Sequence, residues 1–293
     1  MIPASGGSSE DDGIDLPFDP ETDVFWFYVA ECEVKACTAE FYLNDIALIR
    51  NSPDGGYYHA QPVNQYILDG TNELAMIIEP GPQPSLARSG PPEGRREMEV
   101  PLTDPRSATL RLCRYPYGAV VGGPERQLIQ ELRWPQAEHE EPHLYPLPVR
   151  VEFERATGTG PWSWEAAAKL TLDAGTRAEI ESLLNRLWAS LAQGDPALFL
   201  EVAAPRFDDL AEAFEDPPYK KRNAFRRLEA EIQGLQPLDP DTFDLRLAAG
   251  GRMVECLQKD WQPVLRGAPD EAGNEDHYDM FLARLEGEWR IVR

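Results

Sequence analysis

The segment His277–Arg293, HYDMFLARLEGEWRIVR, decides the fold that we expect for the C-terminal part of the chain. Glu286-Gly287 separates two β-rich runs, which predicts a hairpin with a two-residue turn. The predicted opposite pairs are Leu285 with Glu288, Arg284 with Trp289, Leu282 with Ile291 and Phe281 with Val292. One face of this hairpin is apolar and needs a cover, and we expect helices from earlier in the chain to provide it.

The region from residue 176 to residue 194 has the pattern of an amphipathic helix. Thr176 followed by Glu179 predicts a capping box at its start, and Gly194 marks its end. The stripe that should face the sheet consists of Ile180, Leu183, Leu184, Leu187 and Leu191. We expect Trp289 and Ile291 to seal the hairpin against this stripe.

Further elements follow between this helix and the hairpin. Asp195-Pro196 starts a second helical segment that Pro205 interrupts, and a third helix is expected from Tyr219 to Gln233. The expected strands are 243–248, 253–257 and 263–266, with Gly250-Gly251 as the first turn. The sequence therefore predicts helices followed by a sheet in this part of the chain.

This order resembles the cystatin-like cone fold shared by nuclear transport factor 2, ketosteroid isomerase and scytalone dehydratase. The resemblance is carried by Leu187 to Pro196 and by Leu285 to Val292. It implies a cavity between the long helix and a curved sheet, which is an active site, a ligand pocket or a filled core in members of that superfamily. This chain departs from the enzymes of that superfamily because no acid/base set is evident.

The N-terminal part of the chain has a different residue pattern. Residues 1–22 are rich in Gly, Ser and acidic residues and predict a disordered lead. About nine short β-rich runs follow, which is typical of an antiparallel β-sandwich. The runs are 24–34, 39–43, 46–50, 63–68, 73–79, 97–102, 108–113, 127–134 and 149–153. Two long Pro-rich segments, 80–94 and 135–148, are expected to be surface loops.

The stretches 39–48 and 62–74 resemble a pattern of jelly-roll and immunoglobulin-like modules, which include accessory sandwiches of glycoside hydrolases. The resemblance supports a sandwich and implies no sugar contact, because the matching positions are turn and core residues. We therefore predict a mainly β plus α+β protein, with a sandwich domain at 23–156 and a cone-like α+β domain at 162–293. A short Gly-rich linker joins the domains.

The charge balance limits the partners. The chain has 28 basic and 51 acidic side chains and a net charge of −23, which disfavours nucleic acid and anionic membranes. A basic protein partner fits this surface, and so does the simpler explanation of solubility. No apolar run reaches the ~18 residues of a membrane span, so we expect no membrane insertion. We expect a cytoplasmic location, with the periplasm as the alternative if a signal peptide has been removed.

Candidate chemical motifs are few. His139-Glu140-Glu141-Pro142-His143 matches the zinc-protease pattern, but Pro142 breaks the helix that would bring both imidazoles to one metal. We therefore expect neither a metal nor a cofactor. The four cysteines fit small buried hydrophobic residues in a reducing compartment better than a disulfide framework.

Two sets of residues remain as candidate binding sites. His277 and Asp279 share one strand face and could act as a base and its orienting group, or could simply face water. The one basic cluster of the sequence is formed by Lys220, Lys221, Arg222, Arg226 and Arg227. This cluster is either a solvated helix face or a patch for an anion or an acidic partner.

We expect a non-catalytic protein-binding module of a type common in bacteria, either an adaptor or an immunity protein that neutralises a toxin. The alternative is a small-molecule binder or a lyase/isomerase-type enzyme that uses the cone cavity. A filled core would favour the binding module, and a ligand-sized cavity with a buried acid would favour the enzyme. The C-terminal sheet would also allow a homodimer.

Overall fold

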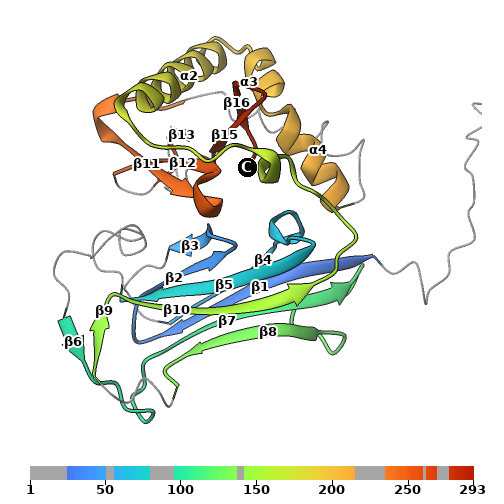
Figure 1. Ribbon diagram of the computed structural model, residues 1–293, viewed down its shortest axis with the longest axis vertical. Helices are drawn as coiled ribbons and strands as arrows, with labels where there is room; N and C mark the ends of the chain where they lie inside the picture. The colour runs from blue at the N-terminus through green and yellow to red at the C-terminus, as the bar shows by residue number, and fades with distance from the viewer. Residues whose placement is uncertain are drawn as a thin grey trace, which may run out of the picture.

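The computed structural model describes residues 25–50, 56–79, 96–136, 142–214, 235–259, 262–268 and 277–293 (Figure 1). Strands account for 45% and helices for 23% of the structure, so the protein is mainly β with several antiparallel sheets. None of the helices in the described ranges has both the length and the apolar composition that a membrane span requires.

The first four-stranded sheet has the order β4-β1-β7-β8, and its neighbours are antiparallel. Its strands are β1 (Trp26–Lys35), β4 (Tyr57–Pro62), β7 (Ser107–Pro116) and β8 (Gln127–Trp134). Alternate residues of β1 point into the protein, because Ala30, Cys32 and Val34 are all inaccessible to solvent.

The second four-stranded sheet has the order β10-β5-β2-β3 and lies face to face with the first (Figure 1). Its strands are β2 (Ala39–Leu43), β3 (Ile46–Arg50), β5 (Gly70–Ile78) and β10 (Leu147–Arg155). Phe41 and Met76 from this sheet share one buried core with Leu110 and Trp134 from the first sheet. We call these two sheets the sandwich. A separate pair is formed by β6 (Arg96–Met98) and β9 (His143–Tyr145).

The strand predicted at 63–68 is wrong. Residues Asn64–Tyr66 form a short 3-10 helix, η1, and the strand lies just before it as β4. The buried Asn64 amide explains the change, because it accepts from Tyr28 N at 2.8 Å and donates to Trp26 O at 3.0 Å. The side chain therefore bonds to the backbone of β1 in place of a ladder partner.

Helix α2 (Ala174–Ala192) follows η3 (Ser163–Ala166) and begins earlier than predicted. Asp173 is its N-cap and accepts from Thr176 N at 2.8 Å, so the predicted capping box at Thr176 is wrong. The predicted end is confirmed by Gly194, whose φ of 77° is a left-handed conformation that suits glycine. The predicted apolar stripe is also confirmed, since all five of its residues are buried.

The second helical segment is divided as expected near Pro205. It forms α3 (Ala197–Val202) and α4 (Ala204–Ala213), and Pro205 occupies the first turn of α4. Asp195 Oδ1 accepts from Ala197 N at 2.9 Å and so helps to start α3. The third predicted helix, 219–233, lies outside the described residues.

The C-terminal sheet has the order β11-β12-β15-β16. Its strands are β11 (Phe243–Ala248), β12 (Met253–Gln258), β15 (Phe281–Leu285) and β16 (Glu288–Ile291), with η4 (Pro240–Thr242) before β11 and η5 (Ala249–Gly251) in the first turn. A short pair, β13 (Leu265–Arg266) with β14 (His277–Tyr278), forms a separate two-stranded sheet. The predicted hairpin register is confirmed for three of the four pairs, and Phe281 instead bonds to both Val292 and Arg293. Glu286 and Gly287 in the turn have positive φ values of 52° and 87°.

Both faces of this sheet are covered (Figure 1). Leu282 and Ile291 pack with the α2 stripe, as predicted. Trp289 is only half-buried, because it lies at the margin of this core and its Nε1 donates to Glu179 Oε2 at 2.9 Å. The expectation that Trp289 is a fully buried seal is therefore wrong, and Ile291 takes that position.

The opposite face of the sheet meets the sandwich in a third buried cluster, which we call the junction core. Ile46 contributes from the sandwich, Trp162 and Trp164 from the connecting segment, and Phe281 and Val292 from the C-terminal sheet. The remaining buried members are Ala167, Ala213, Ala248, Ala249, Met253 and Ala283. The sandwich and the C-terminal part thus have their own cores and share this one.

We predict that Leu184→Ala lowers the free energy of unfolding by about 2 to 5 kcal/mol, because it leaves a cavity where α2 packs on the sheet. Leu184 is fully buried, whereas Leu128 is 52% exposed on the sandwich. The control Leu128→Ala should change stability by no more than about 0.5 kcal/mol. Urea unfolding followed by tryptophan fluorescence measures both, and equal losses would contradict this packing.

Candidate functional site

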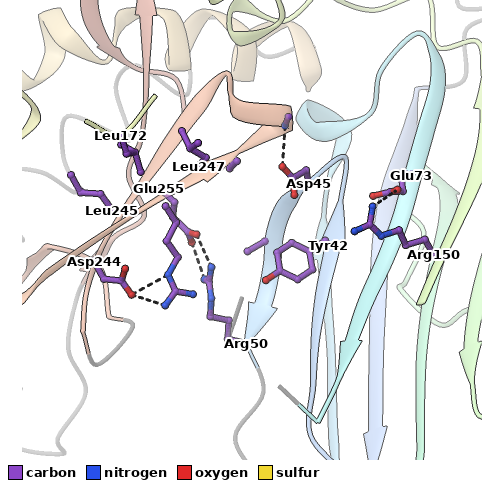
Figure 2. A pocket seen from close by; sticks show the side chains of 14 residues that line it. Tyr42, Asp45, Arg50, Glu73, Arg150, Leu172, Asp244, Leu245, Leu247 and Glu255 are labelled. Carbon is purple, nitrogen blue, oxygen red and sulfur yellow. Dashed lines mark hydrogen bonds and ion pairs between the residues drawn. The ribbon is translucent and has the colours of Figure 1, made fainter. Parts of the chain in front are cut away.

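A pocket of about 600 Å³ lies between the sandwich and the C-terminal sheet (Figure 2). The sandwich contributes Tyr42, Asp45, Ala47, Arg50, Glu73 and Arg150. The C-terminal part contributes Leu172, Asp244, Leu245, Arg246, Leu247, Ala248, Gly250 and Glu255. The alternation of β2 positions this wall, because Phe41 and Leu43 point into the sandwich core while Tyr42 belongs to a small cluster on the other face.

Arg50 and Glu255 form the central contact of the pocket. Arg50 Nη1 donates to Glu255 Oε1 at 2.8 Å, and Arg50 Nη2 donates to Glu255 Oε2 at 2.6 Å. Their side chains are only 15% and 9% exposed. Burial by itself lowers the pKa of Arg50, but the Glu255 carboxylate, together with Tyr42 and Glu40, more than offsets this, so the pKa is raised. The pair is thus a buried, bidentate ion pair between β3 and β12.

The other charged groups of the pocket are also held in place. Arg246 Nε donates to Asp244 Oδ2 at 3.0 Å, within β11. Arg150 and Glu73 approach to 3.5 Å on the sandwich wall. Asp45 Oδ2 accepts from Gly250 N at 3.0 Å and so connects the β2–β3 turn to the first turn of the C-terminal sheet.

The pocket has an apolar wall beside these pairs. Leu247, the penultimate residue of β11, is 44% exposed, and Leu172 and Ala47 line the same pocket (Figure 2). The pocket is therefore a concave surface with a few apolar side chains, and its charged side chains are already hydrogen-bonded or ion-paired within the protein. Such a site can recognise a complementary surface.

The residues predicted as a strand site do not line this pocket. His277 lies on β14, whose backbone pairs with Arg266, and its side chain lies outside the described part of the structure. Asp279 is exposed, and its carbonyl oxygen accepts from Arg206 Nη1 at 3.1 Å. Because the His277 side chain is not described, the pairing of His277 and Asp279 as a base and its orienting group stays a prediction.

The basic cluster of Lys220, Lys221, Arg222, Arg226 and Arg227 lies outside the described residues, as does His139. His143 begins strand β9 opposite Met98, so it is in extended backbone and not in the helix that a zinc-protease motif requires. Among the residues that the structure places, no group of three or more His, Cys, Asp or Glu side chains is arranged to hold a metal.

Arg50 and Glu255 were missed by the sequence reasoning. One signal could have drawn attention to Glu255, because it is the only ionisable carboxylate in the otherwise mostly apolar strand MVECLQ. Such a residue in a buried strand needs a partner. Its partner could not be identified from the sequence, because Arg50 lies 205 positions away.

We predict that Glu255→Gln lowers the free energy of unfolding by about 3 to 5 kcal/mol, because it leaves the Arg50 guanidinium buried without its counter-charge. The matched control is Glu73→Gln, since Glu73 faces Arg150 at 3.5 Å where the arginine is 48% exposed. That change should cost no more than about 1 kcal/mol. Chemical denaturation distinguishes them, and a small loss in both variants would show that the Arg50 pair is not important for stability.

Comparison with known proteins gives no relative on which to base a function. No protein-family model, no curated protein and no solved structure matches this chain. The resemblance to the cystatin-like cone fold stays a prediction, and the geometry of the pocket is the basis for the proposal that follows.

Proposed function

We propose that this protein is a non-catalytic protein-binding module, either an adaptor or an immunity protein that neutralises a toxin. The observation that carries this proposal is the pairing within the pocket: Arg50 with Glu255, Arg246 with Asp244, and Arg150 with Glu73. Groups that already bind one another keep a fixed surface, and a fixed surface with an apolar wall suits recognition.

The interior of the C-terminal part also supports a binding role. The space between α2 and the sheet is occupied by buried side chains, including Leu184, Leu187, Val254 and Leu282. Cys256 lies in the same core, and burial strongly raises the pKa of its thiol. A core filled in this way favours an interaction protein over the alternative, a small-molecule binder or a lyase/isomerase-type enzyme that uses the cone cavity.

Charge favours a basic partner. The pocket is lined by four carboxylates (Asp45, Glu73, Asp244 and Glu255) and three guanidinium groups (Arg50, Arg150 and Arg246). The whole chain has a net charge of −23, so its long-range field attracts cations. We infer that a basic protein surface approaches the pocket and places an apolar side chain against Leu247.

The arrangement of the chain fits this role. We infer a sandwich domain at 23–156 and a cone-like domain at 162–293, whose walls form the pocket together. The four cysteines are free and buried, which favours a reducing compartment and hence a cytoplasmic location. Pairing of two copies through the C-terminal sheet would give a homodimer.

A photoreactive amino acid at position 247 tests the proposal. Irradiation of cells that express the Leu247 variant should produce a discrete adduct with one protein, because the side chain points into the pocket. The matched control places the same group at Leu144, which is 51% exposed on β9 and away from the pocket.

The control should not form the same adduct. Mass spectrometry of the adduct identifies the partner, and Glu255→Gln introduced beside the photoreactive group should weaken its formation. Absence of any protein adduct at position 247, or the same adducts at both positions, would contradict a protein-binding pocket.

A further inference from the structure

Arg293 is an unusual side chain for its surroundings. It is 4% exposed, and its Nε, Nη1 and Nη2 atoms have no hydrogen-bond partner among the described residues. A guanidinium group carries five N–H donors, and leaving buried donors unsatisfied is costly. Its backbone is fixed, because Arg293 O accepts from Phe281 N at 2.8 Å. The Arg293 guanidinium is therefore buried without a hydrogen-bond acceptor among the described residues.

A second guanidinium group lies in the same region. Arg206 on α4 donates from Nη1 to Asp279 O at 3.1 Å. Burial lowers the pKa of Arg293 to about 10, and the nearby positive charge of Arg206 contributes to this decrease. The Arg293 guanidinium also lies over the Tyr66 ring at 4.5 Å, which leaves its edge for hydrogen bonding.

The nearest carboxylates bond to other donors. Asp209 Oδ2 accepts from Ser163 Oγ at 2.7 Å, and Ser163 N lies 3.1 Å from Asp209 Oδ1. Glu165 Oε1 accepts from Trp162 N at 2.7 Å. The negative charges of Asp209 and Glu165 raise the pKa of Arg293, but neither carboxylate accepts a hydrogen bond from its guanidinium nitrogen atoms.

The neighbouring junction core contains one more donor of this kind. Trp164 is 3% exposed, and its Nε1 has no hydrogen-bond partner among the described residues. Trp164 lies between Ser163 and Glu165, whose contacts connect this turn to the surroundings of Arg293. The region thus contains buried donors without a hydrogen-bond partner among the described residues, and the largest of them is cationic.

We propose that this region binds a small inorganic anion, such as chloride or phosphate, through the guanidinium group of Arg293 with support from Arg206. Water could satisfy the same donors, but an anion also balances two guanidinium charges that repel each other. The enclosed position of the nitrogen atoms favours a small anion over an organic ligand. This site is separate from the pocket and does not depend on its function.

Thermal unfolding of the full chain at increasing sodium chloride or sodium phosphate concentrations tests the proposal. The midpoint should rise with a saturable dependence in the parent protein. Arg293→Gln should lose the saturable part of this response. The matched control is Arg290→Gln on the same hairpin, where Arg290 is paired with Glu288 near the surface. The control should respond as the parent does, because it reports only general screening.

Crystals of the unaltered protein soaked in bromide provide a second test that does not depend on a variant folding. An anomalous peak beside the Arg293 guanidinium is the expected result. Two results would overturn the proposal. One is density for water, without an anomalous peak, beside Arg293 in the bromide-soaked crystals. The other is an Arg293→Gln protein that keeps the full parental response to both salts. A response to phosphate alone would identify an oxyanion site, and a response to both would identify a general anion site.

Discussion

The bidentate ion pair between Arg50 and Glu255 is the interaction on which the functional architecture depends. Removing two charges from water is costly, and only good geometry with opposite charge in a low dielectric compensates for it. Here the distances are 2.8 Å and 2.6 Å, and the two residues come from β3 of the sandwich and β12 of the C-terminal sheet. The same contact therefore fixes one side of the pocket and joins its two walls.

Apolar packing and polar contacts reinforce this connection. Trp162 is almost fully buried in the junction core, and its Nε1 donates to Ile67 O in the sandwich at 2.7 Å. Gly160 N in the connecting segment donates to Glu212 Oε1 on α4 at 2.9 Å. The connecting segment is therefore bound to both sides. The pocket lies beside this junction, which gives a recognition surface a preformed shape.

The sequence predicted the parts of the fold that depend on neighbours along the chain. The hairpin register was confirmed because Glu286-Gly287 determines it locally, and the α2 stripe was confirmed because its period is helical. The strand at 63–68 was wrong because Asn64 bonds to residues 36 and 38 positions away. The pocket was not predicted for the same reason, since Arg50 and Glu255 meet only after both sheets have formed.

A double-mutant cycle measures whether Arg50 and Glu255 couple the two walls of the pocket. The cycle compares Arg50→Met, Glu255→Leu and the double variant by their free energies of unfolding. We expect the double variant to be more stable than the sum of the single losses implies, with a coupling energy of about 0.5 to 3 kcal/mol. Single losses that add to within about 0.5 kcal/mol of the double loss would show that the two residues do not couple the walls.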